Sequence, residues 1–205
     1  VGRDHERQQI ADSRVALTRG ESGVIVIEGE PGIGKSRLVA ELVDRAEATG
    51  ITAVVGFAEA LAATTLYHAW RGPLAELLGL GPRGEPSPAI TAALADPELA
   101  PLLPLLATIV PLQLPDNLHI RPHPAEGRAN RAHALVARLL ARELAGRPLL
   151  LVLEDAQWLD SASWALTLLL RFELAPLLLV LATRPIAAPL PAPLRQLHGD
   201  PTCLH

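Results

Sequence analysis

The chain has 205 residues, a formal net charge of −4 and a pI of about 6.0. Hydrophobic residues make up 49% of it, which is typical of a globular chain and excludes a disordered one. Without a basic surplus, we expect no direct nucleic-acid contact by this domain. The single cysteine, Cys203, cannot form an internal disulfide, which favours a cytoplasmic location. The longest uncharged run, 99–115, contains four prolines, so we expect no membrane-spanning helix.

The N-terminal part predicts a helix followed by a strand. Residues 1–20 begin with a lead-in loop and continue as a helix with apolar Ile10, Val15 and Leu17. Residues 23–27 (GVIVI) are a β-branched run, the pattern of a strand buried on both faces.

The segment that follows carries the strongest motif of the chain. Residues 29–36 read GEPGIGKS and match G-x-x-x-x-G-K-[ST] between an apolar strand and a helix expected from 36 to about 49. Gly32 and Gly34 would let backbone N–H groups converge on phosphate oxygens. Lys35, the only lysine of the chain, would reach the β- and γ-phosphates, and Ser36 would ligate Mg²⁺. The candidate nucleotide-binding residues are Gly29, Pro31, Gly32, Ile33, Gly34, Lys35, Ser36 and Arg37.

The middle of the chain predicts a second strand and a helical insertion. Residues 51–55 are the strand, and residues about 60–127 are the insertion, with helical patches at 66–79, 88–95 and 98–109. A regular helix should follow over 128–145, with leucines and Val136 on one face and arginines largely on the other.

Two adjacent carboxylates end the third expected strand, 149–153. Glu154 and Asp155 resemble a Walker B element, in which one group binds the metal ion and another orients or deprotonates the attacking water. Since side chains alternate along a strand, only one of the two should point straight at the metal, and the sequence leaves open which.

The last part predicts another helix and strand. Asp160 or Ser161 should cap a helix running to about Phe172, and residues 177–182 form a fourth strand. Arg184, at the end of that strand, is a candidate sensor of the γ-phosphate.

Other side chains are more simply structural. Trp158 and Trp164 are interpreted as packing residues. His119, His123 and His133 lack the partners of a recognisable metal site.

The alternation of strands and helices predicts an α/β fold: a mainly parallel sheet with helices on both faces, the three-layer sandwich of P-loop NTPases. We expect a single core over 1–205.

Taken together, the motifs resemble the STAND class of P-loop NTPases, relatives of the AAA ATPases. The resemblance covers nearly the whole chain and is carried by VGRDHE at 1–6, the loop at 29–36 with Arg37-Leu38, LLLVLEDAQWLD at 149–160 and LLLVLATRP at 177–185. It differs at Glu154, where the family usually carries an aspartate. The resemblance implies that Val1, Gly2 and Arg3 lie near the adenine or ribose. It also implies that the fourth strand lies between the first and the third.

We expect the chain to be a module of a longer protein, and the resemblance implies that a helical lid should follow it. The class supplies switch modules of LuxR-type transcription activators, adenylate cyclases and other signalling proteins. The leading hypothesis is therefore an ATP- and Mg²⁺-dependent regulatory switch with slow hydrolysis by Lys35, Glu154, Asp155 and Arg184. Its partners would be effector domains of the same polypeptide, with self-association on ATP binding. The alternatives are an AAA-like motor or loader, and a scaffold that binds nucleotide without turnover.

Overall fold

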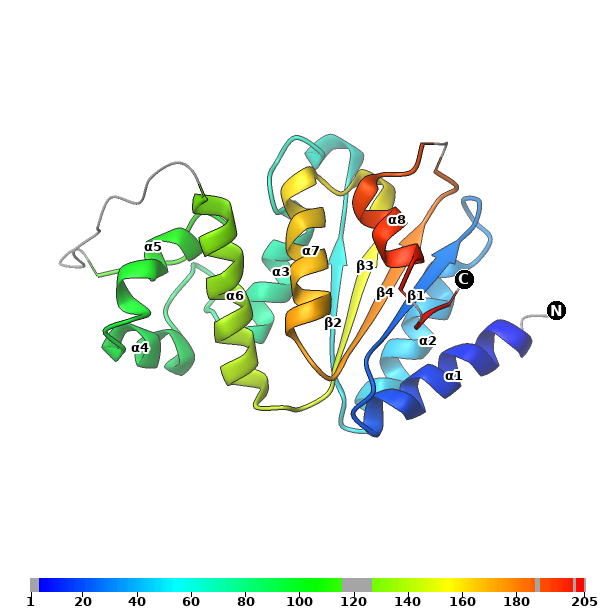
Figure 1. Ribbon diagram of the computed structural model, residues 1–205, viewed down its shortest axis with the longest axis horizontal. Helices are drawn as coiled ribbons and strands as arrows, with labels where there is room; N and C mark the ends of the chain where they lie inside the picture. The colour runs from blue at the N-terminus through cyan, green and yellow to red at the C-terminus, as the bar shows by residue number, and fades with distance from the viewer. Residues whose placement is uncertain (1–3, 116–126, 187–188, 201, 205) are drawn as a thin grey trace.

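The computed structural model describes residues 4–115, 127–186, 189–200 and 202–204, and its centre is a five-stranded sheet (Figure 1). The strand order is β2-β3-β4-β1-β5, and every pairing between neighbours is parallel. The strands are β1 (Gly23–Glu28), β2 (Thr52–Phe57), β3 (Leu149–Glu154), β4 (Leu177–Thr183) and β5 (Cys203–Leu204).

The order of the strands confirms the expected position of the fourth strand. β4 pairs with β1 on one side and with β3 on the other, and all seven of its residues are buried. Buried runs such as LLLVL suit this central place because both of their faces must be covered. The parallel register brings the carboxyl ends of β1, β3 and β4 to one edge of the sheet.

Helices cover both faces of the sheet, as the alternating pattern predicts. α1 (Asp4–Thr18) and α2 (Lys35–Glu47) pack on the face that includes Ile25, Val152 and Val180. The opposite face includes Val24, Leu151 and Leu179. It is covered by α3 (His68–Leu77), α6 (Arg128–Leu144), α7 (Ser161–Glu173) and α8 (Ala192–His198).

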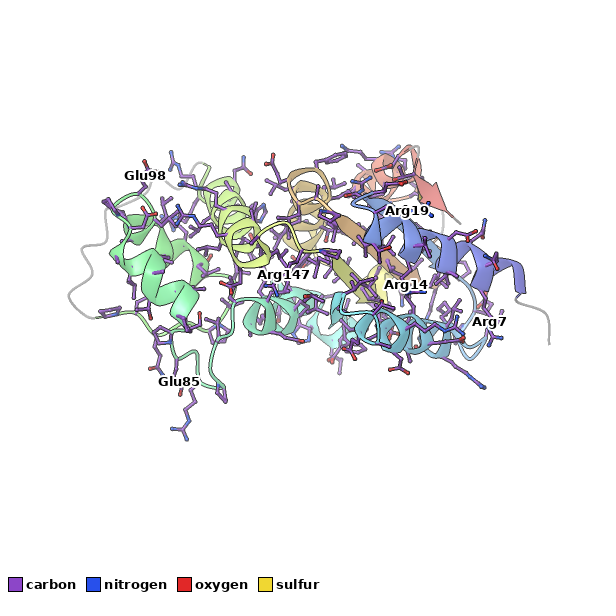
Figure 2. All side chains as sticks on the ribbon, turned by 90° about the horizontal axis from the view of Figure 1, so that it is seen from below. Arg7, Arg14, Arg19, Glu85, Glu98 and Arg147 are labelled. Atoms are coloured by element: carbon purple, nitrogen blue, oxygen red, sulfur yellow. The ribbon has the colours of Figure 1, made fainter. Side chains whose placement is uncertain are left out.

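Polar contacts add to the packing between the first two helices. The guanidinium of Arg7 lies 3.3 Å from the carboxylate of Glu41, and that of Arg14 donates to the Thr49 hydroxyl at 3.2 Å. Figure 2 shows both arginines on α1 beside α2. These contacts are exposed, so apolar burial remains the main source of stability here.

The part of the helical insertion that follows α3 lies beyond the β2 edge of the sheet, at the far end of the molecule from α1 (Figure 1). It contains α4 (Pro88–Ala95), the short 3-10 helix η2 (Ala100–Leu102) and α5 (Leu103–Leu106). The insertion begins with the 3-10 helix η1 (Ala60–Ala62), which follows β2 directly, and with α3. Of the three expected patches, only 88–95 has the predicted bounds. The first begins at 68 because Tyr67 has a left-handed backbone (φ 60°), and the third divides into η2 and α5, each with a proline in its first turn.

The C-terminal part differs most from the expectation. Asp160, and not Ser161, is the N-cap of α7, since its carboxylate accepts from the backbone N–H groups of Ala162 and Ser163. α8 and the edge strand β5 are two elements that the sequence patterns do not predict. Cys203 lies partly buried in β5.

Among the described residues, no single helix is long and apolar enough to cross a bilayer. Two helical segments, Pro88–Ala95 and Ala100–Leu106, are together long and apolar enough for a membrane span, but they are bent by 112° relative to each other.

Candidate functional site

A glycine-rich loop connects β1 to α2 at the carboxyl edge of the sheet. Gly32 and Gly34 have φ angles of 77° and 95°, a left-handed region that L side chains rarely adopt. A Cβ added at Gly32 would meet no heavy atom within 4 Å, so open space lies beside the loop at this point. The loop therefore has the backbone of an anion cradle, in which consecutive N–H groups can turn toward one ligand.

The start of α2 adds a positive end to this cradle. Gly34 is the N-cap and offers no side chain to the first N–H groups of the helix. The first turn of α2, which the structure describes in full, contains no acidic residue that would compete for the helix dipole. An incoming phosphate can therefore take the place of a capping group.

Lys35 is the first residue of α2, and its ammonium lies over the loop. Nζ donates to the carbonyl oxygen of Gly29 at 2.7 Å and to that of Glu30 at 3.1 Å. An ammonium has three donors, so these two bonds leave one for a phosphate oxygen. Three further expected loop residues, Pro31, Ile33 and Arg37, are exposed around the same loop.

The next residue links the loop to the end of β3. The hydroxyl of Ser36 donates to Oε2 of Glu154 at 2.6 Å, although the two residues lie 118 positions apart in the sequence. Glu154 is the last residue of β3 and Ser36 belongs to the first turn of α2. A hydroxyl and a carboxylate oxygen thus converge where the sequence predicts a metal ion.

Asp155 is directed differently from its neighbour. Its backbone is left-handed (φ 52°) and begins the 3-10 turn η3 (Ala156–Trp158). Its Oδ1 accepts a hydrogen bond of 2.9 Å from Nε2 of Gln157, whereas Glu154 accepts from Ser36. The structure therefore separates the two carboxylates that the sequence leaves equivalent.

The end of β4 completes the edge of the site. The backbone N–H of Gly29 donates to the carbonyl of Thr183 at 3.2 Å, which joins the glycine-rich loop to β4. The next residue, Arg184, is exposed, and its backbone N–H donates to Oε1 of Gln157 at 3.0 Å.

Two residues of this edge, Gln157 and Thr183, were not predicted from the sequence as site residues. The hydroxyl of Thr183 lies 3.1 Å from Oε1 of Gln157. The signal available for Gln157 was its place two residues after Asp155, a spacing that permits a side-chain bond within a turn.

The tail of the Walker B segment is structural. The Asp160 carboxylate caps α7 and also accepts from the backbone N–H of Tyr67 at 3.1 Å. Trp164 is buried, as expected of a packing residue, whereas Trp158 is 40% exposed and packs only in part.

A buried polar pair lies behind this tail. The Tyr67 hydroxyl and Nε2 of His133 are 2.9 Å apart, and the rings meet edge to face. Burial lowers the pKa of His133 and, with a smaller contribution from the charge of Asp160, raises the pKa of Tyr67. Both shifts favour the neutral pair, which indicates packing and not catalysis.

Val1, Gly2 and Arg3 lie outside the described part of the chain, so their role near the adenine or ribose stays a prediction. His119 and His123, which the sequence does not assign to a metal site, lie outside it as well.

The donors present fit a divalent cation held together with a phosphate. Within the described ranges, no group of three or more His, Cys, Asp or Glu is placed to hold a metal ion. Mg²⁺ needs no such group, because it commonly takes one or two protein oxygens and completes its shell with waters and substrate phosphates. Ser36 and Glu154 supply two such oxygens beside the cradle.

Comparison with known proteins agrees with this geometry. A family model described as AAA ATPase domain matches residues 1–180. A search of curated proteins finds no match.

Proposed function

The chain belongs to the AAA ATPase domain family, and from that premise we propose that it is a nucleotide-dependent switch that binds ATP with Mg²⁺ and hydrolyses it slowly. The contact between Ser36 and Glu154 carries the proposal, because it joins the phosphate loop to a carboxylate from another strand at 2.6 Å. A glycine-rich turn without a ligand would need no such partner.

The phosphates are held by the loop and by the start of α2. Backbone N–H groups around Gly32 and Gly34 and the positive end of the helix attract the triphosphate. The ammonium of Lys35, already over the loop, neutralises charge on the β- and γ-phosphates. The nucleotide is thus held by local geometry, since the chain as a whole is acidic.

Ser36 and Glu154 are the residues that would hold Mg²⁺. When bound, this ion neutralises charge that develops on the phosphate oxygens. Glu154 is preferred over Asp155 because only the former accepts from the Ser36 hydroxyl, whereas the latter is turned toward Gln157.

Asp155 has the position for the second task, which is to orient the attacking water and accept its proton. Its carboxylate lies one residue beyond the metal ligand and is exposed, so water can reach it. Arg184, at the adjacent end of β4, is the proposed sensor of the γ-phosphate. The bond from Gly29 to Thr183 offers a route by which the state of the loop is passed to β4.

The role as a switch in a multidomain signalling or transcription-regulating protein rests on the resemblance of the motifs to STAND modules. In this role the ATP-bound and ADP-bound states would differ in their contacts with effector domains of the same polypeptide. Slow turnover suits a switch, because the lifetime of the signalling state is then set by hydrolysis or exchange.

Calorimetric titration with ATP·Mg²⁺ tests the binding site. Lys35→Ala should fold and lose most of the affinity, and Ser36→Ala should lose the part that depends on Mg²⁺. Arg45→Ala is a matched control, because it removes a cation from the last turn of the same helix. Unchanged affinity in Lys35→Ala would refute the assignment of the loop.

Turnover tests the proposed mechanism. Asp155→Asn should suppress hydrolysis while ATP still binds, and Glu154→Gln should weaken both binding and hydrolysis in the presence of Mg²⁺. The wild-type rate should lie well below about one per second. A faster rate would indicate a motor, and no turnover would indicate a scaffold.

A further inference from the structure

Gln157 occupies a central position between the Walker B carboxylates and the end of β4. Its side-chain amide contacts three groups: Nε2 donates to Oδ1 of Asp155 at 2.9 Å, and Oε1 accepts from the backbone N–H of Arg184 at 3.0 Å and from the Thr183 hydroxyl at 3.1 Å. The residue itself is only half-buried, so these contacts and not core packing define its place.

The orientation of this amide follows from the chemistry of its partners. A backbone N–H can only donate, and an ionised carboxylate can only accept. If the amide were reversed, its NH₂ would face the N–H of Arg184 and its oxygen would face the carboxylate of Asp155. Only the observed orientation satisfies both of these partners. The Thr183 hydroxyl also lies 3.0 Å from the carbonyl oxygen of Arg184 and could bond to the amide in either orientation. Gln157 is therefore a selective link between Asp155 and the backbone at the end of β4.

The backbone at Asp155 explains why such a link is needed. A non-glycine residue with φ 52° is held in a sparsely populated conformation, which persists when surrounding contacts impose it. The turn is closed by the bond of 2.9 Å from the N–H of Trp158 to the carbonyl of Asp155. This bond fixes the backbone but leaves the exposed carboxylate free to rotate, and the amide of Gln157 removes that freedom.

We propose that Gln157 is a positioning residue that holds the carboxylate of Asp155 in its hydrolytic orientation and ties it to the sensor end of β4. This inference rests on the proposed ATP hydrolysis. Thr183 is buried and accepts from Gly29, so the same amide also connects Asp155 with the first residue of the phosphate loop. Movement of the loop or of β4 would thereby reach the group that orients water.

Two substitutions separate positioning from a merely structural role. Gln157→Met keeps the length of the side chain and removes all three hydrogen bonds. Gln157→Glu keeps the acceptor for Arg184 and Thr183 but replaces the donor to Asp155 with a like charge. A residue that only holds β4 to η3 would tolerate the glutamate variant, whereas a residue that orients Asp155 would not.

The experiment measures kcat for ATP, the Kd for ATP·Mg²⁺ and the melting temperature of each variant. We expect kcat to fall about 10- to 100-fold in both variants, with a Kd within about twofold of wild type. Gln157→Glu should also keep a wild-type melting temperature. Gln8→Met is the matched control, because Gln8 likewise donates to an aspartate Oδ1 (Asp12, 2.8 Å) but lies on α1. Its kcat should not change.

The outcomes distinguish this inference from the function on which it rests. Wild-type kcat in Gln157→Glu, or a loss of ATP affinity in proportion to kcat, would overturn the positioning role and leave the ATPase intact. Absence of turnover in the wild-type chain would overturn hydrolysis itself, and the role of Gln157 with it.

Discussion

Replacing Asp160 by alanine should destabilise the fold and leave ATP binding nearly unchanged. The carboxylate joins two parts of the chain: Oδ1 accepts from the N–H groups of Ala162 and Ser163 at 3.0 Å, and Oδ2 accepts from the N–H of Tyr67 at 3.1 Å. Asp160 therefore caps α7 and also secures the turn before α3.

The loss in free energy of unfolding can be estimated from these contacts. Loss of an N-cap side chain costs about 1 kcal/mol. The N–H of Tyr67, in a buried residue, then lacks its acceptor, which costs about 2 kcal/mol more. The free energy of unfolding should fall by about 3 kcal/mol. For a domain of this size, that lowers the melting temperature by about 9 °C.

Thermal unfolding followed by circular dichroism measures this change, and calorimetry with ATP·Mg²⁺ measures binding. Asp160→Asn is the matched control, because its Oδ1 still caps α7 while its NH₂ group cannot accept from Tyr67. It should recover about 1 kcal/mol of the loss. A melting temperature within about 2 °C of wild type in the alanine variant, or a large loss of ATP affinity, would refute the structural role.

The remaining predictions concern packing, pH and the insertion. Gly56→Ala should destabilise the fold by more than about 1 kcal/mol, since its Cβ would lie 2.2 Å from the carbonyl oxygen of Ala69. Gly72→Ala is the control, because Gly72 lies in the same helix as Ala69 and its added Cβ would meet no atom within 4 Å. This variant should stabilise the fold slightly. Equal melting temperatures for the two variants would contradict the close packing of β2 on α3. Because burial lowers the pKa of His133, its neutral form stabilises the fold above the unfolded pKa of about 6.5, and this contribution is lost as pH falls through the folded pKa. His133→Gln, which can still bond to Tyr67, should flatten the fall in melting temperature between pH 7 and 5.5; an unchanged slope would exclude His133 as its source.

The strands and the phosphate loop were predictable because their signals are local. Short apolar runs between turn residues, such as 149–153, fit strands buried on both faces, and the glycine pattern at 29–36 has few structural solutions. The strand order, in contrast, came from the resemblance, because no local pattern states which strands are neighbours.

The different orientations of Glu154 and Asp155 could not be predicted for another reason. They depend on the left-handed backbone at Asp155 and on partners at Ser36 and Gln157, of which the first is 118 positions from Glu154. Side-chain alternation alone indicates that the two carboxylates diverge, but not which one meets the loop.

The edge strand β5 and the bounds of the patch at 98–109 could not be predicted from the spacing of apolar residues. β5 has only two residues and pairs with β1 at Val24 and Ile25, so its register comes from tertiary contact and not from its own sequence. The helical patch at 98–109 shortens because Pro101 and Pro104 lack the N–H that a continuing helix requires.

In the proposed function, the loop at 29–36 binds a nucleoside triphosphate together with Mg²⁺. Thermal unfolding of the wild-type chain with and without millimolar ATP·Mg²⁺ tests it most directly. At a concentration of about 100 times Kd, binding stabilises by about 2.7 kcal/mol, so the melting temperature should rise by about 5–10 °C, and by much less in Lys35→Ala. An equal melting temperature with and without nucleotide would contradict the account.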